Sequence, residues 1–306
     1  MAVLGPGGVG GLLAALLARA GHRVICLAGE ETVRTLRRDG LRVRSAHFGT
    51  FTARVEADTE LREPVDLCLV TVKHTALDAA LERVPPALVG AGPVVPLLNG
   101  IEHPDALRRR YGAGRVAAGV IRVESTRIAP GLIEHGSPFA EIDLAPPAAG
   151  PDPGTADPLA TAVALLRSAG VRTRVAGDEP AVLWAKFAFL APFALLTTRY
   201  REPIGRVRTE RRTELVALVE EAAAVARASG APTDPARTLA LYDTFPAGAR
   251  SSMQRDAEAG RPLELDAVAG ALLRAAARHR VPVPGAARLT AELESALNPP
   301  APGAGS

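Results

Sequence analysis

The sequence begins with a glycine-rich turn that leaves few choices of fold. The segment GPGGVGG at 5–11 stands between the short apolar run AVL and the Ala/Leu-rich run LLAALLARA. Its glycines match the pattern G-x-G-x-x-G, which allows a tight turn, a close approach of the backbone to a pyrophosphate and close packing of a helix on a strand. The free N–H groups at the start of the following helix favour phosphate. The predicted dinucleotide-binding residues are Gly5, Pro6, Gly7, Gly8, Val9 and Gly10.

The first half of the chain alternates strand-like and helical segments, which is typical of βαβ units and a mainly parallel sheet. The expected strands are Ala2–Leu4, Arg23–Leu27, Leu67–Val72, Val94–Leu97, Arg115–Ile121 and Val171–Val175. The expected helices are Leu12–Ala20, Thr32–Asp39, Ala76–Val84, Pro104–Tyr111 and Leu159–Ala169. A Pro/Gly-rich connection at 145–158 precedes the last helix and strand of this half.

From Asp178 onward the pattern is almost continuously helical, as in Glu210–Ser229 and Leu265–His279. A chain of 306 residues is long enough for two domains. We therefore expect an α/β fold with a second, all-α domain. Residues 1–176 form a Rossmann-like dinucleotide-binding domain with helices on both faces of its sheet. Residues 177–297 form a helical substrate and catalytic domain, and 298–306 form a disordered tail.

Composition narrows the class of protein. The net charge is only +3 and the arginines are scattered, which argues against a nucleic-acid surface. No uncharged apolar run is long enough to span a membrane, and the N-terminus lacks the basic region of a signal peptide. Cys26 and Cys68 lie in apolar, strand-like runs and are expected to be buried free thiols, with no metal site. We expect a cytoplasmic protein.

Lysine occurs at only two positions, Lys73 and Lys186, among 36 basic residues. Either the genome favours arginine and the two lysines are accidental, or these positions need an amine that can lose a proton, which arginine cannot. Lys186 stands in the apolar stretch AVLWAKFAFLAPFALL, where desolvation would lower a lysine pKa and suit a general acid. The alternative is a lysine that extends outward from an amphipathic helix. Lys73 follows the expected strand DLCLVTV, at the edge of the sheet where ligands bind.

Six motifs stand in the order found in ketopantoate reductases (2-dehydropantoate 2-reductases), and the chain resembles this family over nearly its whole length. The motifs are GPGGVG, TVKHTAL at 71–77, LLNGIEH at 97–103, PGLIEHG at 130–136, LWAKF at 183–187 and SSMQRDAEAGRPLELDAVAGALL at 251–273. The resemblance implies reduction of ketopantoate to pantoate by NADPH in pantothenate biosynthesis. It also implies a C-terminal domain like those of 6-phosphogluconate dehydrogenase relatives.

The resemblance assigns roles to individual residues. Lys186 matches the catalytic lysine, and Glu264 matches an active-site glutamate near the substrate hydroxyl and the cofactor. The implied cofactor contacts are Lys73, Asn99 and Thr126, and the implied substrate contacts are Asn99, Lys186, Leu190, Ala194, Ser252 and Glu264. Three of these roles have a plainer alternative: Asn99-Gly100 as an ordinary turn, either serine at 251–252 as a helix cap, and Glu264 as a solvated acid at a helix start.

Three positions depart from the family pattern. Leu190 and Ala194 stand where asparagines usually contact the substrate, so we expect ketopantoate to be used less well than a bulkier, more apolar 2-oxo acid. Gly29 stands where an arginine usually binds the 2′-phosphate. Glu30, twenty residues after Gly10, suits the 2′-hydroxyl of NAD(H), or is simply a helix-start acid. The basic residues that suit the phosphate of NADP(H) are Arg34, Arg37 and Arg38.

The leading hypothesis is an NAD(P)H-dependent reductase of a 2-oxo acid, with ketopantoate as the default substrate and NADP(H) as the expected cofactor. NAD(H) stays open. One alternative is a reductase of the same fold acting on a different, more apolar carbonyl or imine. Another is a non-catalytic NAD(P)-binding sensor, which would not need an amine such as that of Lys186. The expected partner is a small-molecule 2-oxo acid, with no nucleic acid and no membrane, and a homodimer is left open.

Overall fold

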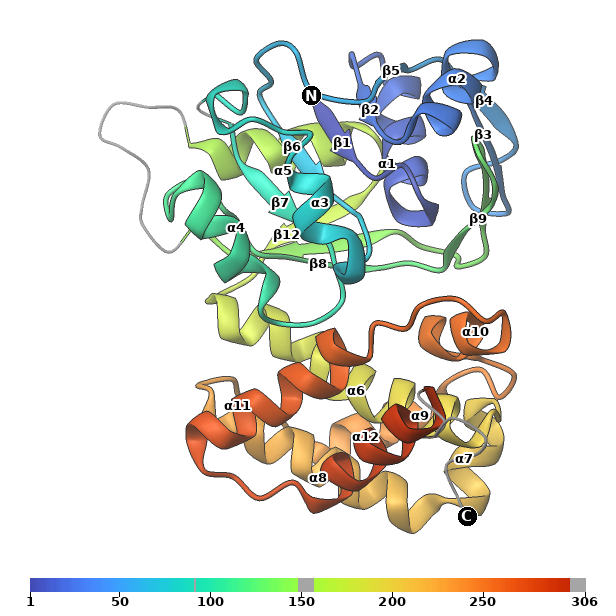
Figure 1. Ribbon diagram of the computed structural model, residues 1–306, viewed down its shortest axis with the longest axis vertical. Coiled ribbons are helices and arrows are strands. Elements are labelled where there is room, and N and C mark those ends of the chain that lie inside the picture. Colours follow the sequence, from blue (N-terminus) through green and yellow to red (C-terminus); the bar gives the residue numbers. More distant parts are fainter. Residues whose placement is uncertain (91, 148–156, 298–306) are drawn as a thin grey trace, which may run out of the picture. The chain divides into compact units, whose positions relative to one another are not determined.

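The computed structural model describes residues 1–90, 92–147 and 157–297 (Figure 1). It divides into two compact units, Met1–Leu183 and Trp184–Ser306. The division falls within helix α6 (Glu179–Tyr200), close to the boundary that the sequence predicts after residue 176. Most of the Pro/Gly-rich connection and all of the expected tail lie outside the described residues.

A five-stranded parallel sheet forms the centre of the first unit, as predicted (Figure 1). Its strands are β1 (Ala2–Leu4), β2 (Ile25–Leu27), β5 (Glu56–Asp58), β6 (Cys68–Val70) and β7 (Val94–Pro96). Their order is β5-β2-β1-β6-β7, and every neighbouring pair is parallel. The carboxyl ends of β1, β6 and β7 therefore meet at one edge, where a dinucleotide binds in sheets of this kind.

Helices cover both faces of this sheet, because alternate strand residues feed two apolar clusters. Val3 and Cys26 pack with the helices of one face, whereas Leu4 and Val70 pack with those of the other. The first face carries α1 (Gly8–Arg19), α2 (Glu30–Asp39) and α5 (Pro158–Ser168). The second face carries α3 (Leu77–Leu81), α4 (His103–Tyr111) and the 3₁₀ turns η1 (His74–Ala76) and η2 (Pro86–Leu88). The Rossmann-like expectation is confirmed.

Two further sheets were not expected. One has the order β4-β3-β10-β9 and consists of β3 (Leu41–Ser45), β4 (Phe51–Ala53), β9 (Ser125–Ala129) and β10 (Leu132–His135). The other has the order β12-β11-β8 and consists of β8 (Gly119–Arg122), β11 (Glu141–Leu144) and β12 (Arg172–Val175). The predicted strand Arg115–Ile121 is divided: Val116 makes one parallel bridge to Val94, and β8 pairs antiparallel with β11.

The second unit is helical throughout the part that the structure describes, which confirms the predicted all-α domain (Figure 1). Beyond α6 it contains α7 (Ile204–Glu210), α8 (Arg212–Ala228), α9 (Pro235–Thr244), α10 (Ser252–Glu258), a π-helical turn (Asp266–Gly270), α11 (Ala271–His279) and α12 (Pro284–Leu297). Among the described helices, α6 alone is long and apolar enough to cross a membrane by length and composition. Since 72% of its most apolar window is buried, α6 has the character of a core helix.

Both cysteines are buried free thiols, as predicted. Cys26 lies on β2 and Cys68 on β6, and each strand pairs with β1. Burial raises the pKa of each thiol to about 12, so both stay protonated at neutral pH.

A buried histidine joins the strands of the four-stranded sheet. His135, on β10, is only 3% exposed. Its Nδ1 lies 2.8 Å from Ser45 Oγ on β3, and its Nε2 lies 3.0 Å from Ser137 Oγ and 3.1 Å from the carbonyl of Phe139. The carbonyl needs a donor, so the neutral ring with its proton on Nε2 fits the network. Burial lowers the pKa of His135, with a smaller contribution from His47 in the same direction.

We expect the free energy of unfolding to fall as the pH drops below about 6.5, because the unfolded histidine binds a proton that the folded one resists. The stabilisation is complete above the ordinary histidine pKa and is lost at lower pH, by at most about 1.4 kcal/mol per pH unit for one group. Urea unfolding at pH 7 and pH 5 measures this change. His135→Gln should flatten the pH dependence, and the exposed control His279→Gln should not. Equal slopes in all three proteins would contradict this interpretation.

Candidate functional site

The glycine turn joins β1 to α1 at the carboxyl edge of the parallel sheet. Gly5 has a φ of +86°, a conformation that other residues rarely adopt, and its N–H donates to the carbonyl of Leu27 at 3.0 Å. Gly7 is the N-cap of α1 and offers no capping side chain, and the first turn of the helix contains no acidic residue. The first N–H groups of α1 and its positive dipole end therefore stay suited to an anion.

The glycines of the turn are required for different physical reasons. A Cβ on Gly8 would lie 2.2 Å from the carbonyl oxygen of Ser125, and one on Gly10 would lie 2.2 Å from Thr71 Oγ1. These two glycines are needed because the chain packs against them. A Cβ on Gly7 would meet only the carbonyl oxygen of Gly5, at 3.9 Å. Gly7 thus faces open space, as expected where a pyrophosphate approaches the backbone. Pro6 is buried beneath the turn and Val9 is partly buried.

Two side chains that the motif does not include hold the turn in place. Thr71 Oγ1 donates to the carbonyls of Leu4 at 3.0 Å and Gly5 at 2.9 Å. Ser125 Oγ donates to the carbonyl of Gly8 at 2.7 Å, which fixes the start of β9 beside the first turn of α1. The predicted cofactor residue Thr126 follows directly and is exposed there. Sequence reasoning missed Thr71, although its place at the end of a predicted strand could have drawn attention to it.

Lys73 and Asn99 follow neighbouring strands of the same edge. Lys73 is exposed and directly precedes η1, three residues after β6 ends. Asn99 comes three residues after β7, and Gly100 turns the chain there with a φ of +98°. Because parallel strands end at one edge, the structure brings both residues to the edge that carries the glycine turn.

The loop after β2 is short and anchored. Gly29 is the N-cap of α2, and Glu30 and Glu31 occupy its first turn. Arg83 Nη1 donates to the carbonyls of Ala28 at 3.0 Å and Thr59 at 2.7 Å, which ties the loops after β2 and β5 together.

The arginines of α2 contact groups of the protein itself. Arg37 Nε donates to the carbonyl of Ala57 at 2.8 Å, and Arg38 pairs with Asp39 at 2.9 Å. Arg34 lies 3.9 Å from Glu30 in an exposed pair. Arg34 is therefore the residue of the three that the chain holds most loosely.

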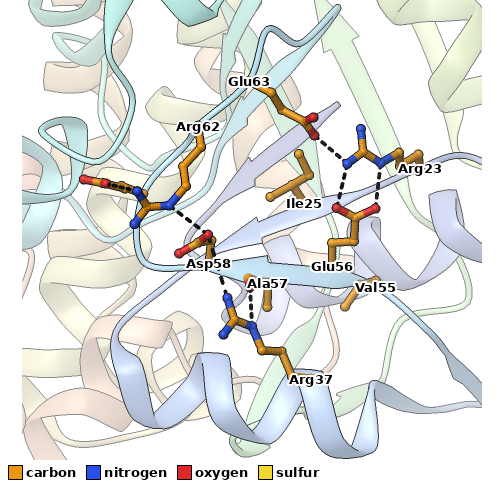
Figure 2. A pocket seen from close by; sticks show the side chains of 10 residues that line it. Arg23, Ile25, Arg37, Val55, Glu56, Ala57, Asp58, Arg62 and Glu63 are labelled. Atoms are coloured by element: carbon orange, nitrogen blue, oxygen red, sulfur yellow. Dashed lines mark hydrogen bonds and ion pairs between the residues drawn. The ribbon is translucent and has the colours of Figure 1, made fainter.

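The hollow in Figure 2, of about 520 Å³, lies along the edge strand β5. Arg23 pairs with Glu56 and Glu63, both at 2.6 Å, and Arg62 pairs with Asp58 at 3.2 Å. Arg37, one of the arginines considered for the phosphate of NADP(H), lines this hollow, whereas none of the residues predicted to contact the pyrophosphate or the substrate does. Its charges compensate one another, and together with Arg37 they cover an edge strand that would otherwise expose its backbone.

In the second unit, Lys186 lies on α6 within a mostly apolar segment of the helix. Lys186 is half-buried beside Phe187, which is 1% exposed. Leu190, one turn further, is also half-buried, whereas Ala194 is only 2% exposed. A side chain larger than alanine at 194 would have to displace its neighbours, so Leu190 is the more accessible of the two departures from the family pattern.

The two adjacent serines have different environments. Ser251 is 2% exposed and is the N-cap of α10, where its hydroxyl accepts from the N–H of Gln254 at 3.0 Å. Thr197, on α6, lies 2.8 Å from the same oxygen. Ser252 is the first residue of α10 and is exposed. The capping role that the sequence left open belongs to Ser251, so the cap does not use the predicted substrate residue Ser252.

Glu264 is 8% exposed, which does not fit a solvated acid at a helix start. Its carbonyl accepts the N–H of Val268 at 3.1 Å, and the π-helical turn begins two residues later. Among the described residues, no cluster of three or more His, Cys, Asp or Glu side chains could hold a metal ion.

The sheet order, the glycine turn and the open position at Gly7 define the first unit as a dinucleotide-binding domain. Comparison with known proteins then gives the family. The model of the domain described as "Ketopantoate reductase PanE/ApbA" matches residues 1–148, and that of its C-terminal domain matches residues 180–296. The chain therefore belongs to the ketopantoate reductase family, which consists of pyridine-nucleotide-dependent reductases, as the resemblance implied.

Relatives match over nearly the whole chain. A 2-dehydropantoate 2-reductase of Caulobacter vibrioides is 31% identical over 97% of this chain and 98% of its own. The crystal structure of a PanE/ApbA family ketopantoate reductase from Ralstonia eutropha JMP134 has a TM-score of 0.86 at 29% identity, covering 97% of this chain and 98% of that chain. A D-mandelate dehydrogenase solved with NADH and anilino(oxo)acetate, at 20% identity, has a TM-score of 0.85 over 97% of this chain and 99% of its own, and shares the fold.

We expect Gly7→Val to abolish dinucleotide binding while the protein stays folded, because the valine would fill the space that Gly7 leaves open. Titration calorimetry with NADPH and NADH, together with a thermal melt, measures both effects. Gly10→Val is the matched comparison and should destabilise the protein itself, since its Cβ would meet Thr71 and Gly5. Unchanged nucleotide affinity in folded Gly7→Val would rule out this binding site.

We expect Ser251→Ala to lower the free energy of unfolding by about 1–3 kcal/mol, because it removes the cap of α10 and a buried partner of Thr197. Ser252→Ala should stay within about 0.5 kcal/mol of the unsubstituted protein, as exposed positions usually do. Chemical unfolding of the two variants decides between them. Equal losses would mean that Ser252 is also a structural residue.

Proposed function

We propose that this protein reduces ketopantoate to pantoate with NADPH as the preferred donor, in the cytoplasm. The observation that supports this most strongly is the family match over both units, together with Lys186 on its apolar helix. A pure nucleotide sensor would have no use for Lys186 and the buried Glu264, which disfavours that alternative.

The glycine turn suits the pyrophosphate of a nicotinamide dinucleotide. Gly7 leaves the space, the N–H groups of α1 supply the donors, and Thr71 and Ser125 keep the turn rigid. Asn99 and Thr126 stand at the same edge as further contacts. When bound, the dinucleotide supplies a hydride to the carbonyl carbon of the substrate.

We assign the preference for NADPH to Arg34. It is exposed on α2, the helix that follows β2, and its ion pair there is the 3.9 Å contact with Glu30. A guanidinium suits a phosphate. Gly29, the N-cap of the same helix, offers no side chain, and the carboxylate of Glu30 would repel a phosphate, so the preference should be modest. NADH is the second donor.

The remaining roles follow from the charge that develops on the substrate. Lys186 donates a proton to the carbonyl oxygen and then recovers one from solvent. Asn99 and Ser252 donate hydrogen bonds to the oxygens of the 2-oxo acid, and Glu264 accepts one from the terminal hydroxyl. A guanidinium would hold its proton too tightly to replace Lys186.

Leu190 favours a second candidate substrate. It places an apolar, half-buried side chain one turn after Lys186, where the family usually has an amide. A bulkier 2-oxo acid without the hydroxyl would lose less binding free energy beside the apolar side chain of Leu190, since each buried polar group left unpaired costs about 1–3 kcal/mol. Reduction of a more apolar carbonyl by the same residues is therefore the alternative function.

We expect Lys186→Ala to lower kcat by roughly 10²–10⁴-fold, the usual effect of removing a general acid, with nucleotide affinity largely unchanged. Lys186→Arg should be nearly as slow, and Lys186→Met is the matched uncharged control. Oxidation of NADPH, followed by its absorbance, gives the rates. An arginine variant with near-normal turnover would show that Lys186 supplies only charge.

The function itself is tested by steady-state rates of the unsubstituted protein with ketopantoate and with more apolar 2-oxo acids, using NADPH and NADH in turn. Leu190 and Ala194 by themselves predict better use of an apolar acid, but the family match over both units favours ketopantoate, so the proposal expects the highest kcat/KM for ketopantoate with NADPH. A better rate for an apolar acid selects the second candidate, and a preference for NADH overturns the choice of NADPH as donor together with the role of Arg34. Absence of turnover with every acid would contradict the proposed function.

A further inference from the structure

Two residues after Glu264, the chain winds through a wide turn. In the π-helical turn Asp266–Gly270, the N–H of Ala271 donates to the carbonyl of Asp266, five residues earlier. At Glu264 the spacing is still α-helical, since its carbonyl accepts the N–H of Val268. Isolated turns of this kind accommodate one extra residue within an α-helix and occur often at functional sites.

The wide turn decides which way Glu264 faces. An α-helix has 3.6 residues per turn, so one extra residue rotates the segment before it by about 100° relative to the helix after it. The helix after the turn is α11, whose Leu272, Ala275 and Ala276 are buried. The wide turn therefore sets the angle at which the side chain of Glu264 leaves the helix relative to the apolar face of α11.

An ion pair spans this turn. Arg274 Nη1 donates to Asp266 Oδ1 at 2.7 Å, and its Nη2 lies 3.1 Å from Oδ2. The same Nη2 lies 3.3 Å from the carbonyl of Asp266, the acceptor of the wide-turn bond from Ala271. Arg274 thus binds both the side chain and the backbone of the residue at which the turn begins.

Gly270 leaves the room for this pair. Asp266, Gly270 and Arg274 are spaced at intervals of four, and a Cβ on Gly270 would lie 2.3 Å from Asp266 Oδ1 and 2.9 Å from Arg274 Nη1. Its φ of −56° is ordinary for a helix, so the backbone does not require glycine. The pair is substantially exposed, with side-chain exposures of 46% for Arg274 and 68% for Asp266, so we expect its loss to change the local geometry of the turn more than the free energy of unfolding.

We propose that Arg274 and Asp266 are positioning residues for Glu264: their ion pair, passing over Gly270, holds the wide turn that directs Glu264 to the substrate hydroxyl. The inference rests on the proposed function only for the role of Glu264. The effect of the Asp266–Arg274 ion pair on the wide turn is a property of the second unit, and it can be measured without enzymatic turnover.

The test compares ketopantoate with the analogue that lacks the terminal hydroxyl. Glu264→Gln should reduce the preference in kcat/KM for the hydroxylated acid by about 10-fold, the size of one lost hydrogen bond to a charged group. Arg274→Met and Gly270→Ala should reduce it in the same direction, even though alanine favours a helix more than glycine does. The exposed Arg278→Met, on the same helix, is the matched control and should leave the preference unchanged.

A double substitution separates positioning from general damage. If Arg274 acts through Glu264, Glu264→Gln combined with Arg274→Met should lose no more preference than Glu264→Gln alone. If the losses of preference from the two single substitutions multiplied in the double variant, the proposal would be overturned. An equal reduction of kcat/KM for both substrates by Arg274→Met would overturn it as well.

Amide hydrogen exchange at Ala271 gives a second readout that needs no activity. The exchange should accelerate in Arg274→Met and not in Arg278→Met, because the first loses the contact at the wide-turn acceptor. Unchanged exchange at Ala271 in Arg274→Met would contradict the proposal that the ion pair holds the wide turn. An unsubstituted protein inactive on both acids would instead contradict the proposed function, and the exchange at Ala271 would still decide whether the pair holds the turn.

Discussion

The contact between Gly10 and Thr71 is the constraint on which the dinucleotide-binding unit depends. A side chain at residue 10 would need the space that Thr71 Oγ1 occupies, and that hydroxyl donates to the carbonyls at the end of β1. Helix α1 can therefore lie directly against the loop after β6. Its own start stays uncapped by side chains, because residues 7 and 8 are glycines. The close contact of Gly10 with Thr71 thus packs α1 on the sheet. The uncapped start of α1 leaves its first N–H groups available to an anion.

The chain uses its two basic residue types for different purposes. Its arginines form ion pairs and bind backbone carbonyls: Arg83 joins two loops of the sheet, and Arg37 covers the edge strand β5 (Figure 2). The fork of a guanidinium suits such bidentate or bridging contacts. The two lysines stand at the carboxyl edge of the parallel sheet and on the apolar helix α6.

In the helical unit, neighbouring residues divide structural and chemical work. Ser251 turns inward to cap α10 and contact α6, which leaves Ser252 at the surface. Glu264 is buried before a wide turn, and the polar groups that span that turn come from residues 266 and 274. The side chains expected to meet substrate are thus supported by others that do not touch it. Arrangements of this kind keep a site within the small tolerances that catalysis requires.

Much of this could be predicted from the sequence because it depends on near neighbours in the chain. The glycine spacing at 5–10 determines a turn, the alternation of apolar runs determines a parallel sheet, and helical periodicity determines the second unit. Those patterns also led to the buried thiols of Cys26 and Cys68. The ends of the strands were predicted less well, since pairing partners decide where a strand stops.

Contacts between distant residues were decided by the tertiary structure alone. Strand β3 pairs with β10, so that Ser45 meets His135 across 90 residues, and Ser125 reaches Gly8 across 117. No local periodicity in the sequence indicates contacts over such distances, and for that reason the four-stranded sheet was not predicted. Likewise, the sequence made Gly7, Gly8 and Gly10 look alike, and Ser251 look like Ser252. Only the packing around each one determined which is held inside the protein and which is left open to a ligand.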